Sequence, residues 1–320
     1  MKDVVLGIDT SAYTTSICVI TSHSHDIVYE KRKLLDVPEG ERGLRQNTAV
    51  FQHLKNLPYF IEEMCSKINP ERLAAVAVSA KPRPADQSYM PVFLAGSSFA
   101  RTVAASRRIP LYELSHQEGH IAAGVGTLDY PMAARKFLMI HLSGGTSEIC
   151  LVERPADGAY QIQLLGGTLD LHAGQFVDRV GVKLGLPFPA GKHLELLAQQ
   201  SQEVLTISSY AKGYDCSFSG PAAKAERLIE MGQHHHFDIA RAVEHCIAKT
   251  LEKIIRFAQS DTQVADVLIV GGVASNSYLR EYLQRRLSHR TAGVSLHFAK
   301  REYSTDNAYG IACLGAEKHF

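Results

Sequence analysis

The sequence predicts an α/β fold of mixed sheets flanked by helices, arranged as two halves built on one plan. Two observations lead to this prediction. A hairpin pattern, T-S-I-C-V-I at residues 15–20, recurs as T-S-E-I-C-L-V at residues 146–152. Each copy is then followed by alternating helical and strand-like stretches, which is typical of α/β layers. Because one copy opens the chain and the other opens its second half, we expect a duplicated architecture.

In the first half, the apolar run Val4-Val5-Leu6-Gly7-Ile8 ends at Asp9-Thr10-Ser11, and residues 17–20 return after a polar turn. β-Branched runs bounded by polar turns are typical of paired strands. Helical spacing follows over residues 48–67, and residues 73–79 have the composition of a buried strand. A second helix is predicted over residues 95–107 and a short strand over residues 110–114.

The second half repeats this order. Residues 137–142 and 149–152 are predicted strands on either side of Ser143-Gly144-Gly145-Thr146. A long amphipathic helix over residues 240–258 precedes a strand at 267–270, a Gly271-Gly272 turn and a helix at 277–287. Residues 166–236 have less regular spacing and are predicted to be a helical insertion. Gly and Pro cluster between residues 124 and 131, which places the predicted domains at residues 1–126 and 127–320.

Composition narrows the class of protein. A chain of 320 residues is long enough for about two domains, and 34 Lys and Arg against 33 Asp and Glu give a net charge of +1. The composition therefore offers no argument for a nucleic acid or a membrane as partner. The first apolar run ends at Asp9, too early for a signal peptide. Six scattered cysteines favour a reducing compartment, so we expect a cytoplasmic protein.

The segment Ser115-His116-Gln117-Glu118-Gly119-His120 carries the sharpest chemical signal. Histidines four apart lie on one face of a helix and can reach one metal ion. A zinc protease of the H-E-x-x-H type is excluded, because its acid directly follows the first histidine and Gln117 stands there instead. With fifteen histidines in the chain, a chance pair remains an alternative, and Gly119 weakens the predicted helix.

Two glycine turns are candidate ligand sites. Ser143-Gly144-Gly145 follows a buried strand, where backbone N–H groups can surround an anion, although such a turn is more often only a hairpin turn. Gly271-Gly272 follows another buried strand and leads through Asn276 into a helix. A helix N-terminus after a strand is a usual place for a nucleotide. The turn lacks both the G-x-G-x-x-G and the Walker patterns, so a Rossmann or P-loop site is not predicted.

Other polar clusters have simpler explanations. Thr305 or Asp306 is predicted to cap the apolar helix over residues 308–316, with a third metal ligand as the alternative function of Asp306. We interpret the run at residues 234–236, three consecutive histidines, as a solvated turn before a helix rather than as a metal tract. The arginine pairs at residues 107–108 and 285–286 are interpreted as solvated faces rather than an RNA-binding patch.

In this order the segments resemble the TsaD family, formerly named O-sialoglycoprotein endopeptidase, whose members make threonylcarbamoyladenosine in tRNA. The resemblance covers essentially the whole chain. It rests on G-I-D-T-S, H-x-E-G-H, the strand ending in S-G-G, L-L-G-G-T-L-D-x-x-A-G-x-x-x-D, L-G-L-P-F-P-A-G, S-F-S-G, G-G-V-A-S-N-x-x-L-R and T-D-N. It implies an actin/Hsp70-like (ASKHA) fold of two duplicated domains, which would account for the repeated hairpin.

The resemblance also implies the site residues and partners. One divalent metal ion, iron or zinc, is expected on His116, His120 and Asp306. A nucleotide ligand, threonylcarbamoyl-AMP or ATP, is expected on His141, Leu142, Ser143, Gly144, Gly145, Asp178, Gly191 and Asn276, with Glu195 near its ribose. No catalytic residue is assigned. The expected partners are tRNA, a TsaB-like actin-fold protein and a TsaE-like ATPase, with no membrane.

Four segments differ from the family pattern. Ala12-Tyr13-Thr14-Thr15 replaces C-D-E-T, residues 81–86 replace a G-P-G loop, Thr146 replaces a histidine, and Leu171 replaces the second acid of I-D-D. The first hypothesis is a metal-dependent transferase that moves threonylcarbamoyl to the adenosine beside the anticodon. The alternative is a paralog that binds metal and nucleotide but uses another acceptor or is a regulatory subunit. A sugar-kinase-type phosphotransferase ranks third, because it gives the histidine pair no role.

Overall fold

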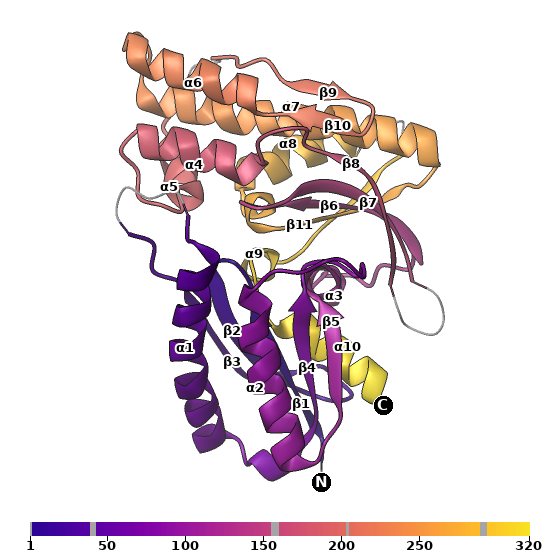
Figure 1. The fold of residues 1–320 in the computed structure, drawn as a ribbon. Helices are drawn as coiled ribbons and strands as arrows, with labels where there is room; N and C mark the ends of the chain where they lie inside the picture. The colour runs from indigo at the N-terminus through magenta and orange to yellow at the C-terminus, as the bar shows by residue number, and fades with distance from the viewer. Residues whose placement is uncertain (1, 39–42, 155–159, 203–204, 289–292) are drawn as a thin grey trace.

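A computed structural model describes residues 2–38, 43–154, 160–202, 205–288 and 293–320, and it contains two five-stranded sheets (Figure 1). The first sheet has the order β3-β2-β1-β4-β5. Its strands are β1 (Val4–Thr10), β2 (Thr14–Thr21), β3 (Ile27–Leu34), β4 (Leu73–Lys81) and β5 (Leu111–Ser115). Strands β1, β2 and β3 pair antiparallel, whereas β4 lies parallel to β1 and β5 parallel to β4.

The second sheet repeats this plan. Its strands are β6 (Lys136–Leu142), β7 (Ser147–Glu153), β8 (Gln161–Gly167), β11 (Asp266–Val270) and β12 (Ser295–Phe298). In the order β8-β7-β6-β11-β12, each strand matches its counterpart in the first sheet in position and direction. The two copies of the hairpin pattern lie on β2 and β7, the equivalent strands. The predicted duplication is therefore confirmed.

Helices α1 (Gln46–Lys67) and α2 (Val92–Arg107) cover one face of the first sheet, where they bury Leu57, Phe60 and Ala100 against β1 and β4. The short 3₁₀ helix η1 (Pro70–Arg72) leads into β4. Helices α7 (His236–Thr262) and α8 (Ser277–Leu287) cover the second sheet in the same way. Helix α8 has the predicted bounds, whereas α2 and α7 begin three and four residues earlier than predicted.

Between β8 and α7 the chain forms a helical layer that packs on α7 (Figure 1). Its elements are α4 (Ala173–Lys183), α5 (Gly191–Ala198), β9 (Tyr210–Lys212), β10 (Asp215–Ser217) and α6 (Ser219–Met231). The helix α7 begins at His236, and His235 is its N-cap residue. The histidine run at residues 234–236 thus ends at a helix start.

The last helix, α10 (Tyr309–His319), packs against β1, β4 and α3 (His116–Gly126), so most of this helix lies in the core of the first sheet. Every residue from Tyr309 to Ala316 is buried. Its buried part is apolar all round, as is typical of a helix that is covered on all sides. The preceding helix α9 (Arg301–Ser304) and the 3₁₀ helix η2 (Gly272–Ser275) lie side by side between the halves.

Helices α3 and α10 cross at unusually close range. A Cβ atom on Gly310 would lie 2.0 Å from the carbonyl oxygen of Gly119 and 2.6 Å from the amide nitrogen of Ala123. No side chain fits there, so position 310 requires glycine. A Cβ atom on Gly119, the glycine that weakens α3 by helix propensity, would lie 2.9 Å from Cδ1 of Ile311. The crossing fixes the start of α3 beside the segment that precedes α10.

All six cysteines are free thiols, as predicted, but Cys65 is exposed while the other five are buried. Within the described ranges, no helix combines the length and the apolar character needed to cross a membrane.

Candidate metal centre and ligand-binding turns

Three side chains converge where α3 begins and α10 is about to begin. We refer to His116, His120 and Asp306 as the His-His-Asp cluster. The two Nε2 atoms lie 3.1 Å apart, and they are 3.5 Å and 3.4 Å from Oδ1 of Asp306. Ligand atoms on a tetrahedral metal at about 2.0–2.2 Å lie about 3.3–3.6 Å from one another. The cluster therefore has the spacing of a three-residue metal site, and no other group of this kind occurs among the described residues.

The start of α3 is fixed by a capping box. Ser115 is the N-cap residue, its Oγ accepts a hydrogen bond from the amide of Glu118, and the Glu118 carboxylate accepts one from the Ser115 amide at 2.8 Å. This reciprocal pair satisfies amides that the helix leaves free. Glu118 is thus a structural acid, consistent with the exclusion of a zinc protease. The predicted helical placement of the histidine pair is confirmed.

Two residues at the end of β1 orient the cluster from behind. Asp9 Oδ1 lies 2.8 Å from Nδ1 of His116 and also accepts a hydrogen bond from Ser79. Ser11 donates a 2.5 Å hydrogen bond to Oδ2 of Asp306. Such outer hydrogen bonds fix the ring and carboxylate orientations of metal ligands. With those atoms engaged, Nε2 of His116 and Oδ1 of Asp306 remain to face the centre of the cluster.

The electrostatics of the cluster are strongly coupled. Burial lowers the pKa of His116, but the carboxylates of Asp9 and Asp306 outweigh burial and raise the pKa to about 10. Burial and the charge on His116 lower the pKa of His120. Although burial opposes ionisation of Asp306, the two histidines hold its pKa well below the usual range. These shifts favour the protonated form of His116, the neutral form of His120 and the ionised form of Asp306.

A third histidine stands next to this cluster. The ring of His141, at the end of β6, lies 4.5 Å from the ring of His120 between centroids. Its Nε2 atom is buried and has no hydrogen-bond partner among the described residues. Burial and the neighbouring histidines hold its pKa well below the usual value.

The Gly271-Gly272 turn lies against the end of β6. Gly271 has φ 98°, and a Cβ atom on it would lie 2.2 Å from the Leu142 carbonyl oxygen.

Residues 143–145, called here the Ser-Gly-Gly turn, follow directly. The Ser143 amide donates to the Thr146 carbonyl at 2.7 Å, and the Ser143 carbonyl accepts from the Gly174 amide at 3.1 Å. A Cβ atom on Gly174 would lie 2.6 Å from the amide nitrogen of Gly144. The N-terminus of α4 therefore rests on this turn, and its partial positive charge favours an anion nearby.

The remaining predicted ligand residues lie on α4, α5 and α8. Asp178 accepts a 2.8 Å hydrogen bond from the amide of Ala190, which brings it beside Gly191. Burial raises the pKa of Asp178 to about 6. Asn276 caps α8 by accepting from the amide of Leu279, and its side-chain amide donates to Glu244 at 2.6 Å.

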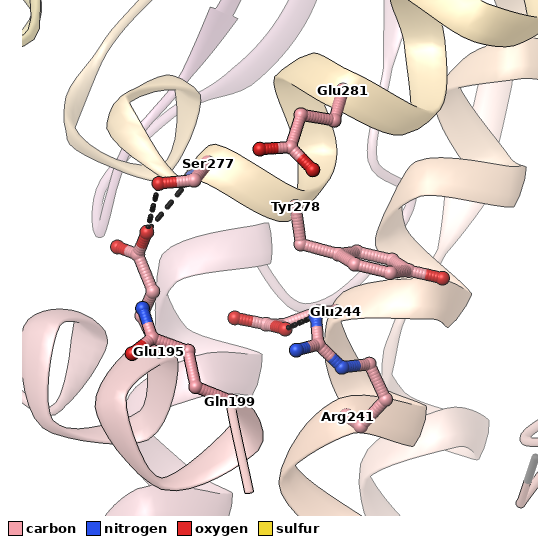
Figure 2. Close-up of a pocket in the computed structure, with 7 residues that line it drawn as sticks. All are labelled: Glu195, Gln199, Arg241, Glu244, Ser277, Tyr278 and Glu281. Atoms are coloured by element: carbon pink, nitrogen blue, oxygen red, sulfur yellow. Dashed lines mark hydrogen bonds and ion pairs between the residues drawn. The ribbon is translucent and has the colours of Figure 1, made fainter. Parts of the chain in front are cut away.

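A small pocket of about 130 Å³ lies among α5, α7 and α8 (Figure 2). We call it the pocket beside Asn276, because Asn276 donates to Glu244 in its wall. Its walls carry the three carboxylates of Glu195, Glu244 and Glu281 together with Arg241 and the ring of Tyr278. Glu195, predicted near a ribose, accepts hydrogen bonds from Ser277 at 2.6 Å and from Arg301 at 3.0 Å. Its carboxylate therefore joins α5 to α8 and α9 and forms one wall of the pocket.

One prediction is wrong. Neither Thr305 nor Asp306 caps the last helix, because Ala308 is its N-cap residue and the Asn307 side chain accepts the hydrogen bond from the Tyr309 amide. The Asp306 carboxylate lies against His116 and His120 instead. Asp9 and Ser11 were missed as site residues. Their signal was the run of polar residues that ends the first buried strand.

Solved structures of other proteins share this fold. Component A of (R)-2-hydroxyglutaryl-CoA dehydratase from Acidaminococcus fermentans superposes with a TM-score of 0.59 at 16% identity over 99% of each chain. A ROK-family glucokinase from Streptomyces griseus superposes with a TM-score of 0.53 at 10% identity, covering 98% of this chain and 99% of its own. The duplicated sheets define a protein of the actin/Hsp70-like (ASKHA) class.

Sequence comparison gives the family. The family model described as "TsaD: tRNA N6-adenosine threonylcarbamoyltransferase" matches residues 37–313, so the chain belongs to the TsaD family of transferase enzymes. A tRNA N6-adenosine threonylcarbamoyltransferase from Thermus thermophilus is 32% identical over 98% of this chain and 93% of its own. Another, from Carboxydothermus hydrogenoformans, is 28% identical over 100% and 93%.

Proposed function

We propose that the chain transfers the threonylcarbamoyl group from threonylcarbamoyl-AMP to N6 of the adenosine beside the anticodon of tRNA. Family membership supports the reaction class, and the names of the relatives support the substrate. The observation that carries the proposal is the position of the His-His-Asp cluster. It lies next to His141, whose strand leads directly into the Ser-Gly-Gly turn. Groups suited to a metal and to a phosphate are therefore neighbours.

His116, His120 and Asp306 would hold one divalent metal ion, iron or zinc. The donor set fits, because all three ligating atoms lie close together and outer hydrogen bonds orient His116 and Asp306. Three protein ligands leave coordination positions open, as catalytic sites require. The bound ion would supply Lewis-acid polarisation of the carbamoyl carbonyl.

The chain's own residues would bind and orient the donor. The Ser-Gly-Gly turn, at the N-terminus of α4, would receive the phosphate of the adenylate. The carboxylates that line the pocket beside Asn276 would accept hydrogen bonds from the ribose hydroxyls. His141 would offer its unpartnered Nε2 to an oxygen of the donor.

In the transfer, the amine nitrogen of the adenosine bonds to the carbamoyl carbon while the bond from that carbon to the phosphate oxygen breaks. AMP leaves with the bonding electron pair, and the amine loses a proton. Preorganised donors aimed at the charge that develops on the leaving oxygens stabilise such a step. The Ser-Gly-Gly turn is the candidate for that role.

Partners and compartment complete the proposal. A "Probable bifunctional tRNA threonylcarbamoyladenosine biosynthesis protein" from Methanocaldococcus jannaschii is 26% identical over 99% of this chain but only 55% of its own length. This supports action together with a second protein, such as a TsaB-like partner or a TsaE-like ATPase. Six free thiols support a reducing, cytoplasmic setting.

The test uses purified protein loaded with metal, synthetic threonylcarbamoyl-AMP, and unmodified tRNA or none. His120→Ala is the test variant, and His23→Ala, which removes an exposed histidine, is the control. We expect about one metal ion per chain and tRNA modification in the wild type and the control, with both lost in His120→Ala. AMP release without tRNA modification would favour another acceptor. Nucleotide binding without donor consumption would favour a regulatory subunit.

A further inference from the structure

One aromatic side chain joins the two halves beside the candidate site. Tyr13 lies in the turn between β1 and β2, two residues after Ser11, the hydrogen-bond donor to Asp306. Its ring meets the ring of Phe188 edge-on, with centroids 6.0 Å apart. Phe188 belongs to the segment between α4 and α5 in the second half. The backbone is held as well, because the Tyr13 carbonyl accepts from the Leu35 amide at 2.8 Å.

One edge of the ring also faces the Ser-Gly-Gly turn, and the hydroxyl lies close to Gly43, where a Cβ atom would be 3.0 Å from it. A Cβ atom on Gly144 would lie 4.0 Å from Cε2 of Tyr13, which is ordinary van der Waals contact. Burial raises the pKa of the Tyr13 hydroxyl, and the carboxylates of Asp178 and Asp306 raise it further, so the phenol is neutral at pH 7. Tyr13 is thus near a carboxylate from each side: Asp306 from the His-His-Asp cluster and Asp178 from the predicted nucleotide residues.

We propose that Tyr13 contacts the acyl group of the donor and determines its selection, its hydroxyl donating a hydrogen bond to that group. The inference rests on the proposed function. In an acyl adenylate the carbonyl carbon is bonded to the phosphate, so a donor with its carbonyl at the His-His-Asp cluster and its phosphate at the Ser-Gly-Gly turn spans the two. Tyr13, whose ring edge faces the turn and whose near neighbour Ser11 holds Asp306, is then within reach of the substituent on the carbonyl. Threonylcarbamoyl carries a carboxylate and a hydroxyl, and both accept hydrogen bonds from a phenol.

The test compares two ligands that differ only in the acyl group. A non-hydrolysable threonylcarbamoyl-adenylate analogue and AMP are titrated by calorimetry into wild type, Tyr13→Phe and Tyr210→Phe. Tyr13→Phe keeps the ring and its contact with Phe188 but removes the hydroxyl. Tyr210, half exposed on β9, is the matched control.

We expect Tyr13→Phe to weaken analogue binding about tenfold, the usual effect of losing a hydrogen bond to a charged group. AMP binding by Tyr13→Phe, and both affinities of Tyr210→Phe, should stay within about twofold of wild type. Unchanged analogue binding would overturn the inference. So would an equal loss of analogue and AMP affinity, which would indicate a role in the fold or the nucleotide site alone. Failure of the proposed function appears separately, as wild-type protein that binds the analogue but modifies no tRNA.

Discussion

At the scale of single residues, two members of the His-His-Asp cluster are each held by a partner from the end of β1. Asp9 fixes the ring of His116, and Ser11 fixes the carboxylate of Asp306. His120 differs, because its Nδ1 atom is buried and has no partner among the described residues. The orientation of the cluster therefore depends on one short polar segment of the first strand as much as on the helix that carries the histidines.

Ser11→Ala removes the hydrogen bond to Oδ2 of Asp306 and leaves all three ligating atoms in place. Loss of an outer partner of this kind typically lowers metal affinity about 10–100-fold. We expect a reduction in that range, measured by competition with a chromophoric chelator. Ser66→Ala, which removes an exposed hydroxyl bonded only to the Glu63 carbonyl, should leave metal affinity unchanged. Equal affinities in wild type and Ser11→Ala would contradict an orienting role for Ser11.

The buried carboxyl of Asp178 predicts a pH dependence of stability. Burial raises its pKa in the folded state from 3.8 to about 6. A raised folded-state pKa means that the folded protein binds the proton more tightly, so this group costs no stability below about pH 4. The cost then develops between about pH 4 and pH 6 and is complete above that window.

Asp178→Asn removes the ionisation and keeps an oxygen to accept from the Ala190 amide. At pH 7.5 we expect the variant to have a free energy of unfolding higher than wild type by on the order of 2 kcal/mol. The difference should vanish near pH 4 in urea-unfolding curves recorded across this range. A difference that is the same at every pH would show that the carboxyl is not desolvated in the folded state.

At the scale of elements, the crossing of α3 and α10 places the site. The two helices occupy equivalent positions after the last strand of each half, and they touch through Gly119 and Gly310. Backbone contact at this distance brings the start of α3 within reach of Asp306, three residues before α10. Gly310, which meets the backbone of the histidine motif, is thus a packing requirement of the site.

Gly310→Ala would push a methyl group into the backbone of α3. Overpacking of this kind typically costs about 1–3 kcal/mol, and because the helices must separate, metal affinity should fall with stability. Gly220→Ala is the control, since a Cβ there meets no atom within 4 Å and lies in helix α6. It should stabilise the protein by up to about 1 kcal/mol. Thermal unfolding and chelator competition test both variants, and an unchanged Gly310→Ala would contradict the close crossing.

Local patterns predicted most of these elements. The repeated hairpin, the helices of each half and the shared face of the histidine pair all depend on residues close in sequence. The capping prediction for Asp306 failed for the opposite reason. Its side chain lies against two histidines almost 190 residues earlier in the sequence. The preferences of residues for helix starts carry no information about such distant contacts. Asp9, Ser11 and Glu244 were missed because only the pairing of distant strands and helices gives them partners.

At the scale of the whole molecule, the last helix of the chain packs on the sheet that its first strands form. The strands of the first sheet come from residues 4–115, but the helix that covers β1 and β4 on one side is α10. The first half therefore buries its sheet only when the last helix is present. No sequence pattern indicated this return, because an apolar helix is equally compatible with either core.

A fragment of residues 1–126 should consequently fail to fold by itself. We expect weak near-UV circular dichroism and no cooperative thermal transition, since the apolar side chains that α10 covers would face water. The same fragment joined through a flexible linker to residues 301–320 should regain a cooperative transition. A cooperative transition in the fragment without those residues would show that the predicted domain at 1–126 is self-sufficient.

The glycine contact between α3 and α10 has a mechanical consequence. Helix α10 packs against β1 and β4 of the first sheet, and α3 packs against β11 of the second, so the close contact of these two helices joins the two sheets. In a rotation of one sheet against the other, atoms near such a contact would move least. The His-His-Asp cluster lies beside this contact. Phe188 and the pocket beside Asn276 belong instead to the helical layers of the second half, away from it (Figure 1). Opening of the two halves would then admit and release a bulky substrate at the rim while the ligating atoms hardly move.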